Sequence, residues 1–190
     1  VKVTPIEAVK TGHNDAICGG CTRKRNIAPS DQKCYVNHFQ APESSHKAHH
    51  GHAVTPLTPV DIQAIRRNGI RFGAYGDPAF LPKQLVTRLC SVAKSAGWTG
   101  YTQRWSLKSS QWLKHVAMAS VSTVAQARKA EAMGGRAFYV RPSGSPLPDG
   151  FTQCPAAKEA GHRTTCQRCN LCNGSGDQDR RRSISTEDHS

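Results

Sequence analysis

Seven of the eight cysteines in this 190-residue chain gather in two groups, one near each end. Thiolates separated by two residues can bind one metal ion, or one edge of a metal cluster, from a single turn of backbone. Both groups therefore predict metal centres. The N-terminal group is Cys18, Cys21 and Cys34, and the C-terminal group is Cys154, Cys166, Cys169 and Cys172.

The C-terminal group favours an iron–sulfur cluster. Its run from Cys166 to Cys172, with gaps of two residues, can present three thiolates to one face of a cuboidal cluster. Cys154, followed by Pro155, offers a remote fourth ligand. Zinc more often uses two CxxC pairs separated by a spacer. We therefore predict a [4Fe–4S] cluster here, with zinc as the alternative.

The N-terminal group has three cysteines and lacks a fourth thiolate. His13, His38 or Asp15 could complete it, or a cysteine of the C-terminal group could cross over. In a third alternative the fourth position stays open, and an open iron binds substrate or cofactor. The chain is therefore predicted to hold one or two clusters.

Composition and hydropathy narrow the class of protein. The apolar content of 37% predicts a modest core to which bound metal adds stability. No stretch of about 18 apolar residues is present, which predicts the absence of a membrane span. The N-terminus lacks the apolar run of a signal peptide, so we expect a cytoplasmic protein with metal-binding rather than disulfide-bonded cysteines. Cys90, on the apolar side of a predicted helix, is expected to fill the core.

The chain is strongly basic, with 26 Lys and Arg against 13 Asp and Glu, a net charge of +13. Such a charge favours a polyanionic partner, and nucleic acid is the first to expect; a plain basic surface is the alternative. Tyr101 and Trp105 are predicted to share a face, for base stacking or for core packing. Four histidines lie close together: His46, His49, His50 and His52. We expect them in a flexible loop, which either contacts phosphate groups or is simply exposed to solvent.

Helix and strand patterns alternate through the middle of the chain. A capping box of Thr58 and Asp61 begins a helix that Gly69 ends. The pattern predicts an α/β fold in which parallel βα units form a partial barrel or an open sheet. The expected helices are 58–69, 81–96, 109–116 and 123–133, and the expected strands are 70–75, 98–103, 117–121 and 136–141.

Ligands of such folds collect where the parallel strands end. Gly76 and Asp77 follow the first predicted strand and could contact a cofactor there. The alternative is a strand-to-helix turn capped by Asp77.

Four segments are expected along the chain. A cysteine- and histidine-rich, irregular segment occupies 1–57, and the βα core occupies 58–142. A cysteine-rich cluster segment follows at 143–174, and a polar tail ends the chain at 175–190. Within that tail, residues 183–185 show only a weak strand pattern.

Several motifs resemble those of an uncharacterised family of cysteine-rich proteins encoded by bacteriophages and related mobile elements. The resemblance covers most of residues 6–185. It implies a phage origin, and hence the cytoplasm of an infected bacterial host, but little about activity. The motifs are CGGC at 18–21, KCYVN at 33–37, YGDP at 75–78, WTGYT at 98–102, MASV at 118–121 and CPA at 154–156.

The layout more distantly resembles that of radical S-adenosylmethionine (SAM) enzymes. These carry a three-cysteine cluster early in a partial βα barrel, and a glycine-containing motif after a following strand holds the methionine amine. The resemblance implies that Gly76 and Asp77 bind SAM, and that the C-terminal group holds a second cluster. The expected function is a radical SAM-like or redox enzyme acting on or near nucleic acid. The alternative is a nucleic-acid-binding module that metal stabilises, without catalysis.

Overall fold

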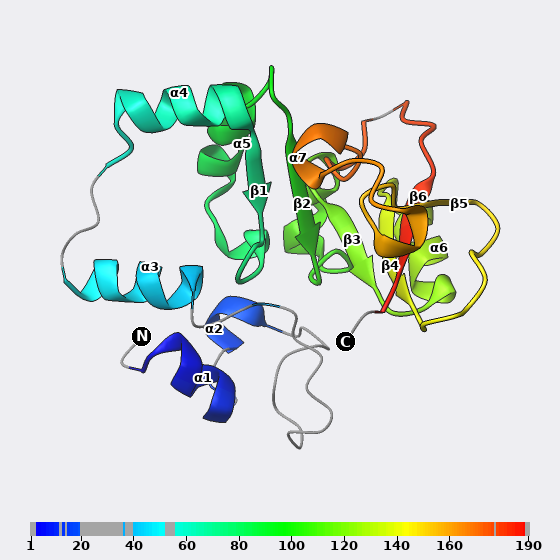
Figure 1. Ribbon diagram of the computed structural model, residues 1–190, viewed down its shortest axis with the longest axis horizontal. Helices are drawn as coiled ribbons and strands as arrows, with labels where there is room; N and C mark the ends of the chain where they lie inside the picture. Colours follow the sequence, from blue (N-terminus) through cyan, green and yellow to red (C-terminus); the bar gives the residue numbers. More distant parts are fainter. Residues whose placement is uncertain are drawn as a thin grey trace.

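The computed structural model describes residues 3–11, 13, 15–19, 36, 40–51, 56–176 and 178–188. Within them, six parallel strands form one open sheet in the order β1-β2-β3-β4-β6-β5 (Figure 1). The predicted α/β fold thus takes the form of an open sheet. The strands are β1 (Ile70–Phe72), β2 (Trp98–Thr102), β3 (Met118–Val121), β4 (Ala137–Arg141), β5 (Phe151–Gln153) and β6 (Ser183–Glu187).

Helices surround the sheet and also occupy the N-terminal segment. The prediction that this segment is irregular is wrong for its described residues, which include short helices. These helices form because they bury small apolar residues such as Ala8 and Val9. The α-helices are α1 (Pro5–Thr11), α2 (Asp15–Cys18), α3 (Ala41–His50), α4 (Pro59–Asn68), α5 (Lys83–Val92), α6 (Val124–Ala132) and α7 (Cys166–Cys169). The 3-10 helices among the described residues are η2 (Pro78–Phe80), η3 (Lys108–His115) and η4 (Lys158–Ala160).

Local signals set several element ends. The predicted capping box of α4 is present, with Thr58 accepting from the Asp61 amide and Asp61 accepting from the Thr58 amide. Thr123 caps α6 in a similar way by accepting from the Gln126 amide. β1 is shorter than predicted because Gly73 takes a positive φ of 76°, which turns the chain out of the strand.

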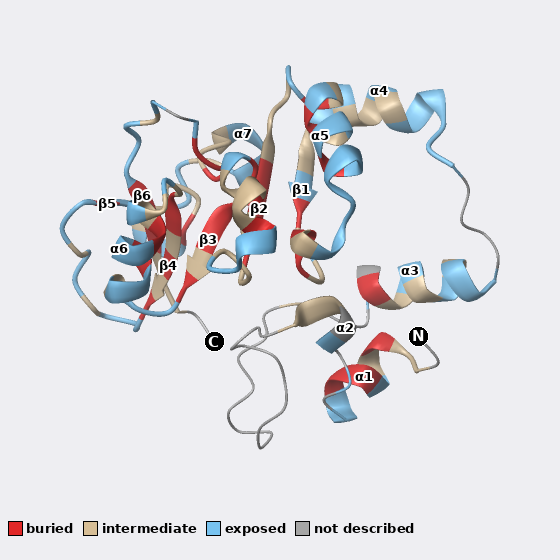
Figure 2. Ribbon diagram, turned by 180° about the vertical axis from the view of Figure 1, so that it is seen from behind, coloured by how far each residue is buried: buried red, intermediate tan, exposed pale blue. Residues whose placement is uncertain are grey.

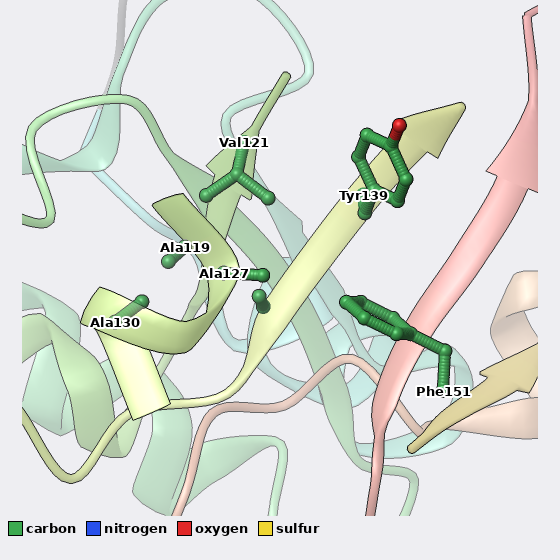
Figure 3. Packing of buried hydrophobic residues seen from close by; sticks show 7 residues of the cluster. Ala119, Val121, Ala127, Ala130, Tyr139 and Phe151 are labelled. Carbon is green, nitrogen blue, oxygen red and sulfur yellow. The ribbon is translucent and has the colours of Figure 1, made fainter. Parts of the chain in front are cut away.

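One face of the sheet is covered by α5, η3 and α6. Ala127 and Ala130 of α6 pack on Ala119 and Val121 of β3. Figure 3 shows this cluster, in which the rings of Tyr139 and Phe151 lie 5.8 Å apart. A second cluster on α5 includes Cys90, which is 8% exposed and lies among apolar residues as expected. Burial is concentrated along the strands, while α4 has no buried residue (Figure 2).

The cysteine-rich segment between β5 and β6 covers the opposite face. From β1 to β4 the strand order advances in one direction, but the step from β5 to β6 goes back. Because connections between parallel strands are right-handed, a reversed step places its connection on the other face. Accordingly, Cys172 packs with Met118 of β3 and Ile184 of β6.

Residues 183–187 of the predicted polar tail are a strand, which the weak pattern at 183–185 indicated. They form β6, between β4 and β5, and the side chains of Ser183 and Ile184 are 2% and 1% exposed. A polar strand is stable here because its hydroxyls find partners: Ser183 donates to Glu131 and accepts from the Ala137 amide. β5, which the sequence pattern did not predict, is three residues long.

No helix in the part of the chain that the structure describes is long and apolar enough to cross a membrane.

Candidate metal centre

The four cysteines of the C-terminal group come from two stretches that meet on one face of the sheet. Cys154 directly follows β5, and its amide donates to the carbonyl of Ser185 in β6 at 2.8 Å. Cys166 and Cys169 are the first and last residues of α7. The carbonyl of Cys172 accepts from Gly100 of β2 at 2.9 Å. Backbone bonds to two strands thus fix both ends of the group.

The turn after α7 holds the cysteine run against the sheet. Asn170 has a left-handed φ of 52°, which ends the helix one residue after Cys169. Its side-chain amide donates to the carbonyl of Ala96 at 2.8 Å, just before β2. A Cβ on Gly97 would lie 2.5 Å from the Asn170 side chain, so glycine is needed for this close approach.

The pKa values of Cys154 and Cys172 are raised, mainly by burial. Burial raises the pKa of Cys172 to about 12, and three thiols add to this effect: Cys154, Cys166 and Cys169. Burial likewise raises the pKa of Cys154, and Cys166 and Cys169 again contribute. Yet among the described residues no three His, Cys, Asp or Glu side chains are placed so that they could hold a metal ion.

Positive charge surrounds Cys172. The guanidinium of Arg136, a residue only 3% exposed, donates to the carbonyls of Leu171 at 2.7 Å and Arg182 at 2.7 Å. Arg181 lies in the same loop and pairs with Asp179. Burial and the nearby Arg181 lower the pKa of Arg136.

Tyr101 of β2 lies beneath Cys172. Its side chain packs against the apolar cluster that contains Cys172, and burial is the main cause of a raised pKa for Tyr101. The Tyr101 ring packs against Phe138 of β4 with centroids 4.8 Å apart, and Arg71 lies 5.8 Å from its centroid on β1. Neighbouring strands therefore hold the phenol in place below the thiol.

The N-terminal group is represented by Cys18, because Cys21, Cys34 and His38 lie outside the described residues. Cys18 ends α2, which lies beside the carboxyl ends of β1 and β2 (Figure 1). The carbonyl of Ile17 accepts from the Asp77 amide at 2.9 Å. Cys18 is thus brought to the edge of the sheet where ligands of parallel folds bind. Of the proposed fourth ligands, His13 contacts the hydroxyl of Thr11 at 2.9 Å.

Gly76 and Asp77 do follow β1, but the Asp77 carboxylate faces inward. It accepts from the Ala79 amide at 2.9 Å, which caps η2, and from the Thr102 hydroxyl at 2.8 Å. Its second oxygen accepts from the Gln103 amide at 2.7 Å. These bonds join the end of β1 to the end of β2 and favour the turn-capping role over cofactor binding.

Two predictions about nucleic-acid contacts are corrected. Tyr101 and Trp105 do not share a face, because Trp105 lies beyond the end of β2 and packs on the cluster under α6. His46, His49 and His50 lie on helix α3 rather than in a loop, and His52 is outside the described residues.

Arg136 and Tyr101 were missed as candidate site residues. Arg136 directly precedes β4, and nothing in its own neighbourhood in the sequence marks it as buried. Tyr101 was predicted to serve in base stacking or in core packing, and not next to a metal centre. Both acquire their position near Cys172 through β6 and the reversed connection. No protein-family model matches the chain, and no curated protein or solved structure matches it.

Proposed function

We propose that this is an iron–sulfur protein, in which Cys154, Cys166, Cys169 and Cys172 hold a [4Fe–4S] cluster. The observation that carries the proposal is that Cys154, next to β5, and Cys172, bonded to β2, pack in one cluster on the same face of the sheet. Scattered core cysteines would have no reason to converge in this way. The chemistry that a bound cluster supplies is one-electron transfer.

The spacing of the thiols favours a cluster over zinc. Zn–S bonds of about 2.3 Å bring four tetrahedral thiolates to about 3.8 Å from one another. A cuboidal cluster binds each thiolate at a separate iron and keeps the sulfurs farther apart. The run of Cys166, Cys169 and Cys172 at gaps of two residues, with Cys154 as a remote fourth ligand, favours the cluster.

The charge near Cys172 also supports thiolate ligands. The loop brings together the cations of Arg136 and Arg181 with one anion, Asp179. Four thiolates around a [4Fe–4S] core give the centre a net negative charge, which would balance the excess cation. Neutral thiols would leave that positive charge buried without compensation.

Anaerobic purification followed by iron, sulfide and zinc analysis tests the proposal. We expect iron and acid-labile sulfide in equal amounts, together with a brown colour from thiolate-to-iron charge transfer. The Cys169→Ala variant should lose this cluster. Stoichiometric zinc without iron or sulfide would contradict the proposal and leave the zinc alternative.

A second candidate function is nucleic-acid binding at the face that carries the cysteine-rich segment. Lys158, Arg163 and Arg168 are exposed in this segment. Its acidic residue Glu159 bonds inward to Thr186 and to the amide of Glu187. The surface left to a partner is therefore basic, and retention of DNA or RNA at low salt would support this function.

Radical SAM chemistry at the N-terminal group stays a prediction, as do the phage origin and the cytoplasm of an infected host. The position of Cys18 at the carboxyl ends of the strands supports a site there, whereas the bonds made by Asp77 do not support its role as a cofactor ligand.

A further inference from the structure

The middle of the chain carries positive charge without negative charge. Residues 78–130 contain eight Lys and Arg and no Asp or Glu. They include η2, α5 and η3 and most of α6, which are the helices on one face of the sheet. The carboxylate that directly precedes this stretch, Asp77, is 9% exposed and accepts three hydrogen bonds from inside the fold. An anion that approaches these helices therefore meets cations that no carboxylate of the same stretch neutralises.

Exposed apolar side chains gather in the same stretch, where β1 and β2 end. Phe80 and Leu81, at the end of η2, are 44% and 40% exposed, and Leu107, at the start of η3, is 40% exposed. Because η2 packs against η3, these side chains belong to one surface. Clustered apolar side chains at the surface mark an interaction site. We call this site the η2–η3 surface, and its members are Phe80, Leu81, Lys83, Arg104, Leu107 and Lys108.

A cation–π contact joins the two halves of the η2–η3 surface. The guanidinium carbon of Arg104 lies 4.8 Å from the centroid of the Phe80 ring. A Cβ on Gly19 would lie 2.9 Å from Nη1 of Arg104 and 3.3 Å from Cζ of Phe80, so the residue that follows α2 packs on the same pair. An aromatic ring and a guanidinium are thus held together at the carboxyl ends of β1 and β2, the edge at which parallel sheets bind ligands.

The cations of this surface are available to a partner. Lys83 and Lys108 are exposed, and Arg104 is half-buried. Within the residues that the structure describes, no carboxylate forms an ion pair with any of the three. Asp15, the acidic residue of α2, lies at the end of that helix away from Gly19.

We propose that the η2–η3 surface binds single-stranded nucleic acid, with a base stacked on the Phe80–Arg104 pair and with phosphates bound by Lys83 and Lys108. Bases stack on aromatic rings and on guanidinium groups, and a basic surface follows the phosphate backbone. In a duplex the base faces are covered by neighbouring base pairs, so they cannot reach the ring. This surface is separate from the cysteine-rich face, and the proposal does not depend on the cluster.

Four full-length variants test the surface against a labelled oligo(dT) of about 16 nucleotides, an oligo(U) of the same length and a duplex. Phe80→Ala removes the ring, whereas Phe80→Tyr keeps it. Lys83→Gln with Lys108→Gln removes two cations of the surface. The matched control is Lys94→Gln with Lys129→Gln, because these two exposed lysines come from the same stretch but lie before β2 and β4 rather than after a strand. Melting temperatures of all variants are measured first.

Phe80→Ala should weaken binding of oligo(dT) and oligo(U) about fivefold or more, with duplex binding unchanged, and Phe80→Tyr should bind like wild type. The Lys83 and Lys108 double variant should weaken single-strand binding. It should also make the slope of log affinity against log salt shallower by about 0.7 for each lost phosphate contact. The control pair removes the same charge and should keep the wild-type slope. Equal losses in the two lysine pairs would overturn the proposal, as would equal losses of single strand and duplex in Phe80→Ala.

The remaining outcomes separate this partner from others. A wild-type protein that does not retain oligo(dT) at about 50 mM salt would overturn the proposal. Polyglutamate that displaces oligo(dT) equally well from wild type and from Phe80→Ala would show recognition of charge alone, and would also overturn it. If Phe80→Ala fails to fold, the two pairs of exposed lysines still decide. Absence of iron and sulfide would contradict the proposed function alone, because this comparison needs no bound metal.

Discussion

Identical thiols take up different roles in this chain because of their surroundings. Cys90 lies between helix α5 and the sheet, where its neighbours are apolar and no other described cysteine belongs to its cluster. Cys169 lies at the end of α7 among other thiols. Position therefore decides which cysteine is core and which is a candidate ligand.

Cys90→Ala should keep the cluster, whereas Cys169→Ala should lose it. The first change removes one buried sulfur, which should cost on the order of 1 kcal/mol of unfolding free energy. The second removes a proposed ligand and the stability that metal binding adds. Iron analysis and thermal melts of both variants check this, and equal iron content in the two would contradict the assignment.

Asp77→Asn should destabilise the fold by about 1–3 kcal/mol without removing iron from the C-terminal group. The carboxylate accepts three hydrogen bonds, from the amides of Ala79 and Gln103 and from the hydroxyl of Thr102. The NH₂ group of an asparagine is itself a donor, so it would face one of these donors and that hydrogen bond would be lost. Denaturant unfolding measures the change. Unchanged stability together with loss of SAM binding would favour the cofactor role instead.

At the scale of elements, α2 is held at the turn after β1 by the bond from the Asp77 amide to the Ile17 carbonyl and by close packing of Ile17 on Gly76. A Cβ on Gly76 would lie 2.3 Å from Ile17 Cγ2, and Gly76 has a φ of 85°. The Gly76→Ala variant should therefore release α2 from the carboxyl ends of β1 and β2 while the sheet persists. Amide hydrogen exchange should show faster exchange at residues 15–19 and unchanged exchange in β3 and β4. Uniformly faster exchange would instead show that the turn supports the whole sheet.

The helix η4 is tied to the ends of β4 and β6 by a carboxylate. Burial opposes ionisation of Glu159, but bonds from the Glu187 amide and from the Gln153 and Thr186 side chains prevail. They lower its pKa from 4.5 to about 2. Arg141, 4% exposed, lies between Glu159 at 3.9 Å and Glu187 at 3.1 Å.

A carboxyl group whose pKa is lower in the folded state than in the unfolded state stabilises the fold. This stabilisation is complete above the pKa of the unfolded state and is lost as the pH falls to the pKa of the folded state. Wild-type stability should therefore fall between about pH 4.5 and about pH 2, and Glu159→Gln should remove this part of the pH dependence. Urea unfolding at a series of pH values measures the difference. Parallel curves for wild type and variant would exclude Glu159 as a source of the pH dependence.

At the scale of the whole molecule, a net charge of +13 attracts polyanions such as nucleic acids. Binding to DNA or RNA should weaken several-fold or more between about 50 mM and about 200 mM salt, because contacts to phosphate release counterions. Arg163→Gln with Arg168→Gln should weaken it more than Arg66→Gln with Arg67→Gln on α4. Filter binding tests this, and equal losses would show that the cysteine-rich face is not the binding surface.

The sequence by itself determined the elements whose hydrogen bonds and apolar spacing are local. The Thr58 and Thr123 caps, the α5 and α6 helices and the first four strands were predictable because each depends on neighbouring residues. The grouping of cysteines was likewise visible as spacing. Short helices in the N-terminal segment were missed because their apolar stretches are brief.

Tertiary structure alone decided the place of β6 and, with it, the candidate centre. Residues 183–185 show a weak strand pattern, but bonds to β4, β5 and α6, which that pattern does not reveal, stabilise the polar strand. Because β6 lies between β4 and β5, the step from β5 to β6 runs back across the sheet, although β6 stays parallel to its neighbours. A right-handed connection then places the cysteine segment on the face opposite α6. There the segment meets Tyr101, and Arg136 binds it, so long-range packing rather than spacing determines what surrounds Cys172.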